Sequence, residues 1–237
     1  MTTVFNCVDL LAFKRLLDMT FYNHQKNNNA WNIIHSKSIY AQFPHSDTIS
    51  LFETIFNNKN LSILELGCGS GNNQIYFRKK YSNVTGIDIS ISAIKNSKKL
   101  LKKNKVRNVK NLIVMDIKNA HKIKKKYDIV YDYRSVSNLP KKFVKQLFID
   151  IIKIIKPNGF FCFRLYSKKW IKDPRSKKHS MGKHKNIYLT TFSKKEIEDL
   201  IPRKFKIIKF EEYMYKDKIK NKVQYAEFDI IARLTKS

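Results

Sequence analysis

Glycine is scarce in this chain of 237 residues, which has only six, together with five prolines and three cysteines. The cysteines (Cys7, Cys68 and Cys162) follow one another at unrelated spacings, which indicates neither a disulfide framework nor a zinc site. No run of about 18 apolar residues occurs, so no membrane span is expected. The first 21 residues lack a basic start and a small-residue cleavage site, so no signal peptide is expected. These absences favour a reduced, cytoplasmic protein.

Acidic residues are also few, 19 against 48 basic ones, which gives a formal net charge of +29. Such a balance is typical of nucleic-acid-binding proteins, because lysine and arginine release counterions from phosphates. Nucleic-acid recognition favours arginine for its bidentate geometry, however, and 40 of the 48 cations are lysines. The lysines are spread along the whole chain. An anionic partner and a lysine-enriching codon bias both remain open, and the even spread favours codon bias.

Short apolar runs alternate with helical patterns from residue 61 onward, which is typical of βαβ units and a parallel sheet. The hydrophobic fraction of 43% is that of an ordinary globular protein. Five strands are predicted, at residues 62–66, 83–88, 111–116, 127–132 and 159–167. Three helices are predicted between them, at residues 72–81, 91–104 and 141–156, the last stopping at a Pro-Asn-Gly sequence.

Both ends of the chain differ from this alternating part. A helix over residues 193–201 is predicted from Ser193 as N-cap, with Glu196 completing a capping box. Two alternating strands follow it, at residues 204–213 and 223–235. The first 60 residues are predicted to form a helical cap or lid, with breaks at residues 25–30 and at Pro44, and residues 61–237 to form the main domain. A basic, irregular insertion near residues 168–190 is predicted to be a substrate loop.

Half of the glycines lie within five residues, at Gly67, Gly69 and Gly71, directly behind the first strand. Glycine there can adopt positive φ, or leave room where a Cβ would collide with a ligand. In an open α/β sheet this turn lies at the carboxyl end of the strand, where ligands bind. The spacing therefore predicts a binding loop for a cofactor.

Three carboxylates accompany this loop. Glu65 comes two residues before the first glycine, and Asp88 ends the second strand, where a carboxylate can accept both hydroxyls of a ribose. Asp116 ends the third strand, where a carboxylate and the next backbone N–H can hold an adenine ring. Simple capping of the following helix is the alternative for Asp116.

The sequences ELGCGSG, GIDIS, VMDI and IIKPNGFF resemble the successive motifs of class I S-adenosylmethionine-dependent methyltransferases. The resemblance runs from about residue 60 to the C-terminus. It implies a Rossmann-like α/β fold with helices on both faces of a seven-stranded sheet, mostly parallel with an antiparallel C-terminal hairpin. It also implies S-adenosylmethionine as cofactor and S-adenosylhomocysteine as product.

Position by position, the resemblance implies roles for single residues. Glu65 and the three glycines fall at the methionine end of the cofactor, and Asp88 falls at its ribose. The remaining cofactor positions are Ile89, Asp116 and Ile117 beside the adenine, and Tyr131 with Asp132 beside the transferred methyl.

Methyl transfer from a sulfonium needs a nucleophile aligned behind the methyl and, for a hydroxyl or protonated amine, a base. After the fourth strand, Asp132 is predicted to be that base and Arg134 to clamp a carboxylate or phosphate of the acceptor. A structural ion pair between the two is the alternative. Tyr133 is predicted to contact the acceptor.

Histidines and aromatic residues elsewhere supply further candidates. His24, His35, His45, His179 and His184 are candidate bases, since histidine titrates near neutrality. His179 is included among the catalytic predictions and His184 among the substrate contacts, because the insertion that carries them is expected to overhang the pocket. Trp31, Tyr40 and Tyr22 are predicted to cover the cofactor or form an aromatic wall; ordinary helix packing is the alternative.

The leading functional prediction is a methyltransferase acting on an O or N atom of a small molecule, such as a metabolite, sugar or natural-product intermediate. An anionic acceptor would fit Arg134. The alternative is an RNA methyltransferase that uses the basic surface, but no Pro-Pro-aromatic motif, Pro-Cys nucleophile or appended RNA-binding module is present. A cofactor-binding partner subunit without transferase activity is a third hypothesis.

Overall fold

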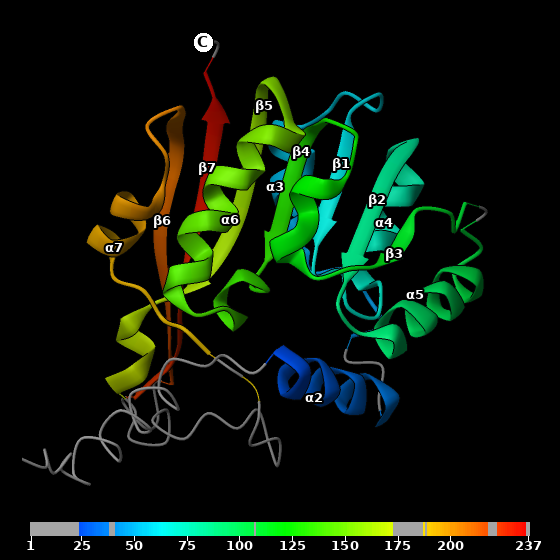
Figure 1. Cartoon of the computed structure of the whole chain (residues 1–237), viewed down its shortest axis with the longest axis horizontal. Coiled ribbons are helices and arrows are strands. Elements are labelled where there is room, and N and C mark those ends of the chain that lie inside the picture. Colours follow the sequence, from blue (N-terminus) through cyan, green and yellow to red (C-terminus); the bar gives the residue numbers. More distant parts are fainter. Residues whose placement is uncertain are drawn as a thin grey trace, which may run out of the picture.

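The computed structural model describes residues 24–37, 41–106, 108–172, 187, 189–217 and 222–235. Within these residues, seven strands form one sheet in the order β3-β2-β1-β4-β5-β7-β6. Six strands run in the same direction, and only β7 of the described strands runs opposite, pairing antiparallel with both β5 and β6 (Figure 1). The strands are β1 (Ser62–Leu66), β2 (Asn83–Asp88), β3 (Leu112–Val114), β4 (Tyr127–Tyr133), β5 (Ile155–Tyr166), β6 (Phe205–Asp217) and β7 (Lys222–Leu234). The predicted sheet, with its antiparallel hairpin, is confirmed.

Helices cover both faces of the sheet. On one face, α6 packs Val144 and Phe148 against the inward side chains of β4 and β5, such as Val130 and Phe161. On the other face, Phe52 of α3 and aromatic residues of α4 pack against the opposite side of the same strands. The helices are α2 (His24–Lys37), α3 (Ser46–Ile55), α4 (Asn72–Lys80), α5 (Ile91–Lys103), α6 (Lys141–Ile154) and α7 (Lys194–Leu200).

The helix ends follow local sequence signals closely. Ser90 caps α5 by accepting a hydrogen bond from the Ala93 N–H at 3.0 Å. Ser193 and Glu196 form the predicted capping box at the start of α7. In both helices the serine oxygen satisfies a backbone N–H that has no partner within the helix, and this fixes where the helix begins.

The predicted helix break at residues 25–30 is wrong, because α2 runs through this asparagine-rich stretch without interruption. Asparagine has a low intrinsic helix propensity, but contacts with the rest of the fold override it here. Ala30 and Ile34 are buried against Ile187. The Asn32 side chain accepts hydrogen bonds from the Ser90 hydroxyl (2.9 Å) and the Ser92 N–H (3.3 Å), which attaches α2 to the start of α5.

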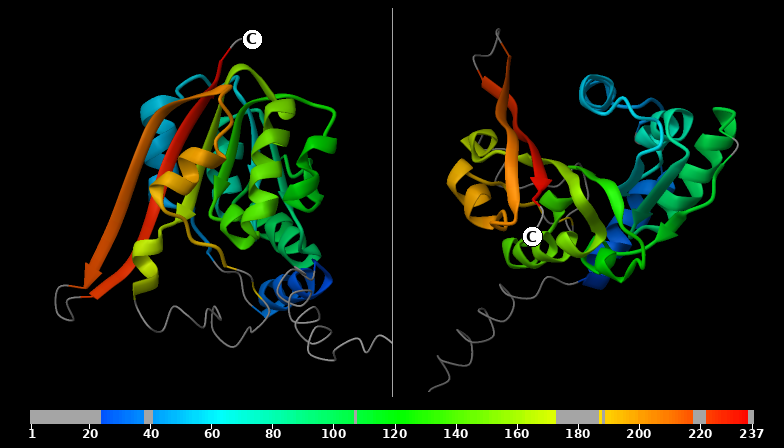
Figure 2. Two further views of the ribbon diagram at one scale, coloured as in Figure 1. Left: turned by 60° about the vertical axis from the view of Figure 1, so that its left-hand side comes forward. Right: turned by 90° about the horizontal axis from the view of Figure 1, so that it is seen from above.

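Two strands are longer than the sequence pattern predicts. The β6–β7 hairpin extends to Asp217 and Lys222, and Figure 2 shows its far end reaching past the neighbouring strands. β5 begins at Ile155, directly after α6, and its register against β4 shifts before Phe160. α6 therefore ends at Ile154, two residues before the predicted end, and the Pro-Asn-Gly sequence lies within the irregular start of β5.

Cys68 and Cys162 are buried and unpaired, and burial raises the pKa of both thiols well above its usual value. In the part of the chain that the structure describes, no cluster of three or more His, Cys, Asp or Glu side chains is placed to hold a metal ion. None of the helices described there is long and apolar enough to cross a membrane.

Candidate active site

A cavity of about 340 Å³ lies at the carboxyl ends of the parallel strands. The loop after β1 and the ends of β2 and β4 line one side of the cavity. The helix α2, which crosses below those strand ends in Figure 1, lines another side. Parallel strands bring their carboxyl ends to one edge of a sheet, so residues far apart in sequence meet there. Glu65, Asp88, Asp116 and Arg134 all line this single cavity.

The three loop glycines have positive φ, +59° at Gly67, +52° at Gly69 and +88° at Gly71. Their surroundings differ. A Cβ at Gly67 would lie 2.3 Å from Ser135 Cβ, and one at Gly71 would lie 2.2 Å from Ser97 Oγ, so both positions are filled by the protein itself. At Gly69 the nearest atom would be His35 Cε1, at 3.6 Å. Gly69 therefore presents its bare backbone to the cavity.

Glu65 is buried at the end of β1 and is held by two amides of α4. The Asn73 side chain donates to Glu65 Oε1 at 3.0 Å, and the Gln74 side chain donates to Oε2 at 2.6 Å. Gly86 makes room for this contact, because a Cβ there would lie 2.9 Å from Gln74 Cδ. Burial raises the pKa of Glu65 to about 7, despite the two amide hydrogen bonds. A cationic group in the cavity would favour the ionised form.

Asp88 links the second strand to the glycine loop. Its Oδ2 accepts from the Gly69 N–H at 2.9 Å, and its Oδ1 accepts from the Ser90 N–H at 2.8 Å. Burial raises the pKa of Asp88, and nearby His35 opposes that shift. Each carboxylate oxygen keeps a further lone pair for a donor in the cavity, such as a ribose hydroxyl.

Ile89, Asp116 and Ile117 line the cavity beside Asp88, as expected for adenine-binding positions. Asp116 is also the N-cap of the short helix η1 (Ile117–Lys122), because its side chain accepts from the Lys118 N–H at 2.9 Å. The capping interpretation of Asp116 is therefore seen in the structure, and it is compatible with a place at the cavity.

Tyr131 and Asp132 lie deeper than the sequence comparison implies, and neither lines the cavity. The Tyr131 hydroxyl pairs with Thr48 Oγ1 at 2.7 Å, and its ring packs edge-on against Phe52. Asp132 is fully buried and accepts hydrogen bonds from the Ser135 hydroxyl and the Val136 N–H. Burial raises the pKa of Asp132 to about 7. Ser135 lines the cavity, so Asp132 reaches it through this hydroxyl.

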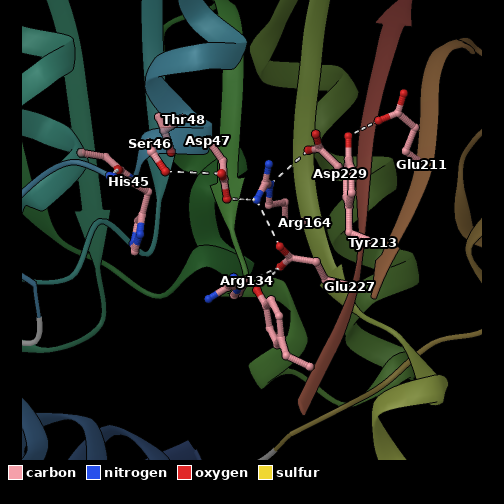
Figure 3. A network of polar contacts seen from close by, with 12 residues as sticks. His45, Ser46, Asp47, Thr48, Arg134, Arg164, Glu211, Tyr213, Glu227 and Asp229 are labelled. Carbon is pink, nitrogen blue, oxygen red and sulfur yellow. Dashed lines mark hydrogen bonds and ion pairs between the residues drawn. The ribbon is translucent and has the colours of Figure 1, made fainter. Parts of the chain in front are cut away.

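The alternative of an ion pair between Asp132 and Arg134 is wrong. Arg134 pairs with Glu227 of β7, with 2.8 Å between Nε and Oε2. Glu227 Oε1 lies 3.1 Å from Arg164, which also contacts Asp47 of α3 and Asp229 of β7 (Figure 3). Arg134 thus belongs to a buried charge network that spans α3, β5 and β7.

His45 and Tyr133 lie between this network and the glycine loop. Their rings are stacked, with centroids 4.1 Å apart and planes 12° apart. Asn73 Oδ1 accepts a hydrogen bond from the His45 backbone N–H at 3.1 Å, which ties His45 to the amide that holds Glu65. Burial and the charge of Arg134 lower the pKa of His45 to about 4, so its imidazole is neutral at pH 7. A neutral imidazole can accept a proton.

Of the remaining residues predicted to contact the cofactor or the acceptor, only some lie in the part of the chain that the structure describes. Trp31 and His35 line the cavity from α2, and His35 Nδ1 lies 3.1 Å from the Ser70 hydroxyl. Tyr22, Tyr40, His179 and His184 lie outside the described residues, and the His24 side chain is not described. Sequence reasoning missed Tyr166, Trp170 and Asn73 as cavity residues. Tyr166 ends β5, so the rule that ligands bind at the carboxyl ends of strands could have identified it.

A family of methyltransferase domains matches residues 57–227, which include the glycine loop, Asp88, Asp116 and Arg134 but not the cavity residues of α2 or His45. The chain belongs to this family. The recognition of the class I methyltransferase superfamily from the sequence motifs is thereby confirmed. The prediction of a methyltransferase with S-adenosylmethionine as cofactor agrees with the family.

Individual relatives differ in what their names say they methylate. The chain is 30% identical over 158 residues to a malonyl-[acyl-carrier protein] O-methyltransferase of Priestia megaterium, a match that covers 65% of this chain and 52% of that protein. It is 33% identical over 107 residues to the mouse EEF1A lysine methyltransferase 2, a match that covers 42% of this chain and 43% of that protein. The chain therefore spans about half the length of the curated relatives it matches.

Among solved structures, magnesium protoporphyrin IX methyltransferase from Synechocystis, determined with bound S-adenosylmethionine, superposes with a TM-score of 0.65. The match covers 88% of this chain and 95% of that protein at 12% sequence identity. At 12% sequence identity, this match shows a similarity of fold and nothing about the acceptor.

Proposed function

We propose that this methyltransferase-family protein transfers a methyl group from S-adenosylmethionine to an O or N atom of a small, anionic acceptor. The observation that carries the proposal is one cavity with two chemically different ends. One end has Glu65, the bare backbone of Gly69, Asp88 and Asp116. The other has His45 with the aromatic and cationic residues around Arg134.

The first end fits the cofactor in charge and shape. Glu65 is a buried carboxylate with a raised pKa, which suits the ammonium group of the methionine end. Gly69 allows close backbone approach, since a Cβ there would meet only His35 Cε1, at 3.6 Å, and would otherwise face the cavity. Asp88 suits two ribose hydroxyls, and Asp116 with Ile117 suits the adenine.

When bound, the cofactor would supply an electrophilic methyl group on its sulfonium, with a neutral thioether as the leaving group. The chain's own residues then have to orient the acceptor and remove its proton. Arg134 and Tyr133 hold the acceptor, and the neutral imidazole of His45 takes the proton that a hydroxyl oxygen loses as it bonds to the methyl group. Asp132, the base predicted from the sequence, acts in this proposal only through the Ser135 hydroxyl.

The alternative is methylation of RNA, favoured by the net charge of +29. Counting against it is the spread of the lysines along the whole sequence. The likeness to a lysine methyltransferase makes a protein acceptor a third outcome to test.

Incubation with methyl-labelled S-adenosylmethionine and cell extract, separated into small-molecule, RNA and protein fractions, tests these acceptors together. We expect label in the small-molecule fraction, and loss of that label in Asp88→Ala. Label confined to RNA or to protein would refute the small-molecule proposal while leaving the cofactor assignment intact. No cofactor binding at all would refute both.

A further inference from the structure

Arg134 stands in a backbone conformation that is unusual for any residue other than glycine, with φ at +72°. This region is sparsely populated because the side chain crowds the backbone, and it persists only where surrounding structure holds it. β4 ends at the preceding residue, Tyr133. The guanidinium lies over the ring of Tyr133, with Cζ 4.5 Å from the ring centroid. The strained turn therefore places the cation back over the strand end, beside the cavity.

The guanidinium is fixed from several sides. Its Cζ lies 4.6 Å from the Tyr225 ring centroid and 5.6 Å from that of Tyr166. Its Nε is paired with Glu227, which also accepts from the Tyr225 hydroxyl at 2.5 Å. A planar guanidinium that is stacked on aromatic rings and anchored through Nε is preorganised for bidentate contact with a carboxylate.

Glu227 contacts both Arg134 and Arg164. Figure 3 shows Glu227 between the two arginines, with Asp47 and Asp229 on the far side around Arg164. The two aspartates contact Arg164 and not Arg134. The charge network therefore fixes the guanidinium of Arg134 through Nε, at the cavity that this residue lines.

Two tyrosines complete this end of the cavity as donors. Tyr133 and Tyr166 both line the cavity beside Arg134. Burial raises the pKa of both hydroxyls, so they stay protonated at neutral pH and can donate to an anion. Trp170 lines the same wall, with its ring centroid 4.7 Å from that of Tyr166. Such a wall offers stacking surface to a planar ring.

From this arrangement we infer that the acceptor is a planar aromatic carboxylate. Its carboxylate binds Arg134 between the hydroxyls of Tyr133 and Tyr166, and its ring lies against Tyr166 and Trp170. The inference rests on the proposed function and narrows the substrate class of that site. In this arrangement, Glu227 and Arg164 are positioning residues: they hold the guanidinium of Arg134 in place and do not contact the acceptor themselves.

Calorimetric titration of the full chain saturated with S-adenosylhomocysteine tests this inference with matched probe pairs. The pairs are 4-hydroxybenzoate with 4-hydroxybenzamide, and indole-3-carboxylate with indole-3-carboxamide; cyclohexanecarboxylate tests the need for a planar ring. We expect at least one aromatic carboxylate to bind about 10- to 100-fold more tightly than its amide, as for a hydrogen-bonded charge pair. Cyclohexanecarboxylate should bind several-fold more weakly.

Three variants test which residues cause the preference for a carboxylate over its amide. Arg134→Gln should abolish the preference for the carboxylate, and Tyr166→Phe, which keeps the ring, should reduce it several-fold. Arg233→Gln is the matched control: it removes an exposed arginine that contacts the Asn158 carbonyl oxygen, away from the cavity, and should change nothing.

The outcomes separate the two proposals. Failure of S-adenosylhomocysteine to bind would refute the cofactor assignment itself. Normal binding of S-adenosylhomocysteine with no preference for any carboxylate over its amide would overturn only the acceptor inference. A preference that survives in both Arg134→Gln and Tyr166→Phe would overturn it as well. If Arg134→Gln fails to fold, Tyr166→Phe alone decides.

Discussion

Substituting Gly69 with alanine separates the ligand-facing role of this glycine from an ordinary structural one. Gly69 has φ at +52°, and a Cβ there would meet His35 Cε1 at 3.6 Å, an ordinary contact. The neighbouring Gly71 has φ at +88°, and a Cβ there would lie 2.2 Å from Ser97 Oγ. Gly71→Ala is therefore the matched control, with the same added methyl and the same kind of backbone strain.

The expected stability changes differ between the two variants. A left-handed backbone costs an alanine about 1–2 kcal/mol, and for Gly69→Ala this is the whole expected loss. At about 2–4 °C per kcal/mol for a chain of this size, the melting temperature should fall by about 2–8 °C. Gly71→Ala adds overpacking of about 1–3 kcal/mol, for a total of about 2–5 kcal/mol and a fall of about 4–20 °C.

The effects on cofactor binding should show the opposite order. A methyl at Gly69 occupies space that the cofactor needs, and overpacking of about 1–3 kcal/mol corresponds to roughly 5- to 150-fold weaker binding. Melting curves and calorimetric titration with S-adenosylhomocysteine measure both quantities on the same samples. The reasoning is refuted if Gly69→Ala binds S-adenosylhomocysteine with wild-type affinity, or if it loses as much stability as Gly71→Ala.

Three further predictions use the carboxylates. Asp88→Ala should weaken S-adenosylhomocysteine binding by about 10- to 100-fold, through loss of charge-assisted hydrogen bonds to ribose hydroxyls; near-normal affinity in a titration would contradict the ribose role. Because burial raises the pKa of Glu65 to about 7, the affinity for S-adenosylhomocysteine should decline as the pH falls below 7. The variant Glu65→Gln should bind S-adenosylhomocysteine weakly, with an affinity that depends less on pH. An unchanged pH dependence of affinity in that variant would argue against Glu65 as the ammonium ligand. Partial burial alone would raise the pKa of Glu196, but hydrogen bonds from two lysines and the Ser193 N–H outweigh it and lower the pKa to about 2. The stability that this group contributes is present above its ordinary pKa of about 4.5 and should be lost as the pH falls toward 2, a loss that melting curves of Glu196→Gln should lack.

The sequence by itself determined the strands of the sheet and the cofactor loop. The short segments SILEL and NVTGID, whose apolar residues are buried in the sheet, located β1 and β2 at their observed ends. The clustered glycines predicted positive φ at Gly67, Gly69 and Gly71, because few other residues adopt it without strain. Local chemistry likewise fixed the capping box of α7.

Only the tertiary structure decided what the acceptor end of the site contains. The partner of Arg134 is Glu227, which lies 93 residues away, and no local pattern distinguishes it from Asp132 as a partner. The hydroxyl of Tyr131 pairs inside the fold with Thr48, which lies 83 residues away in the sequence. The unbroken helix α2 likewise depends on contacts with α5. Such long-range pairings depend on how elements pack, so periodicity and local propensity carry no record of them.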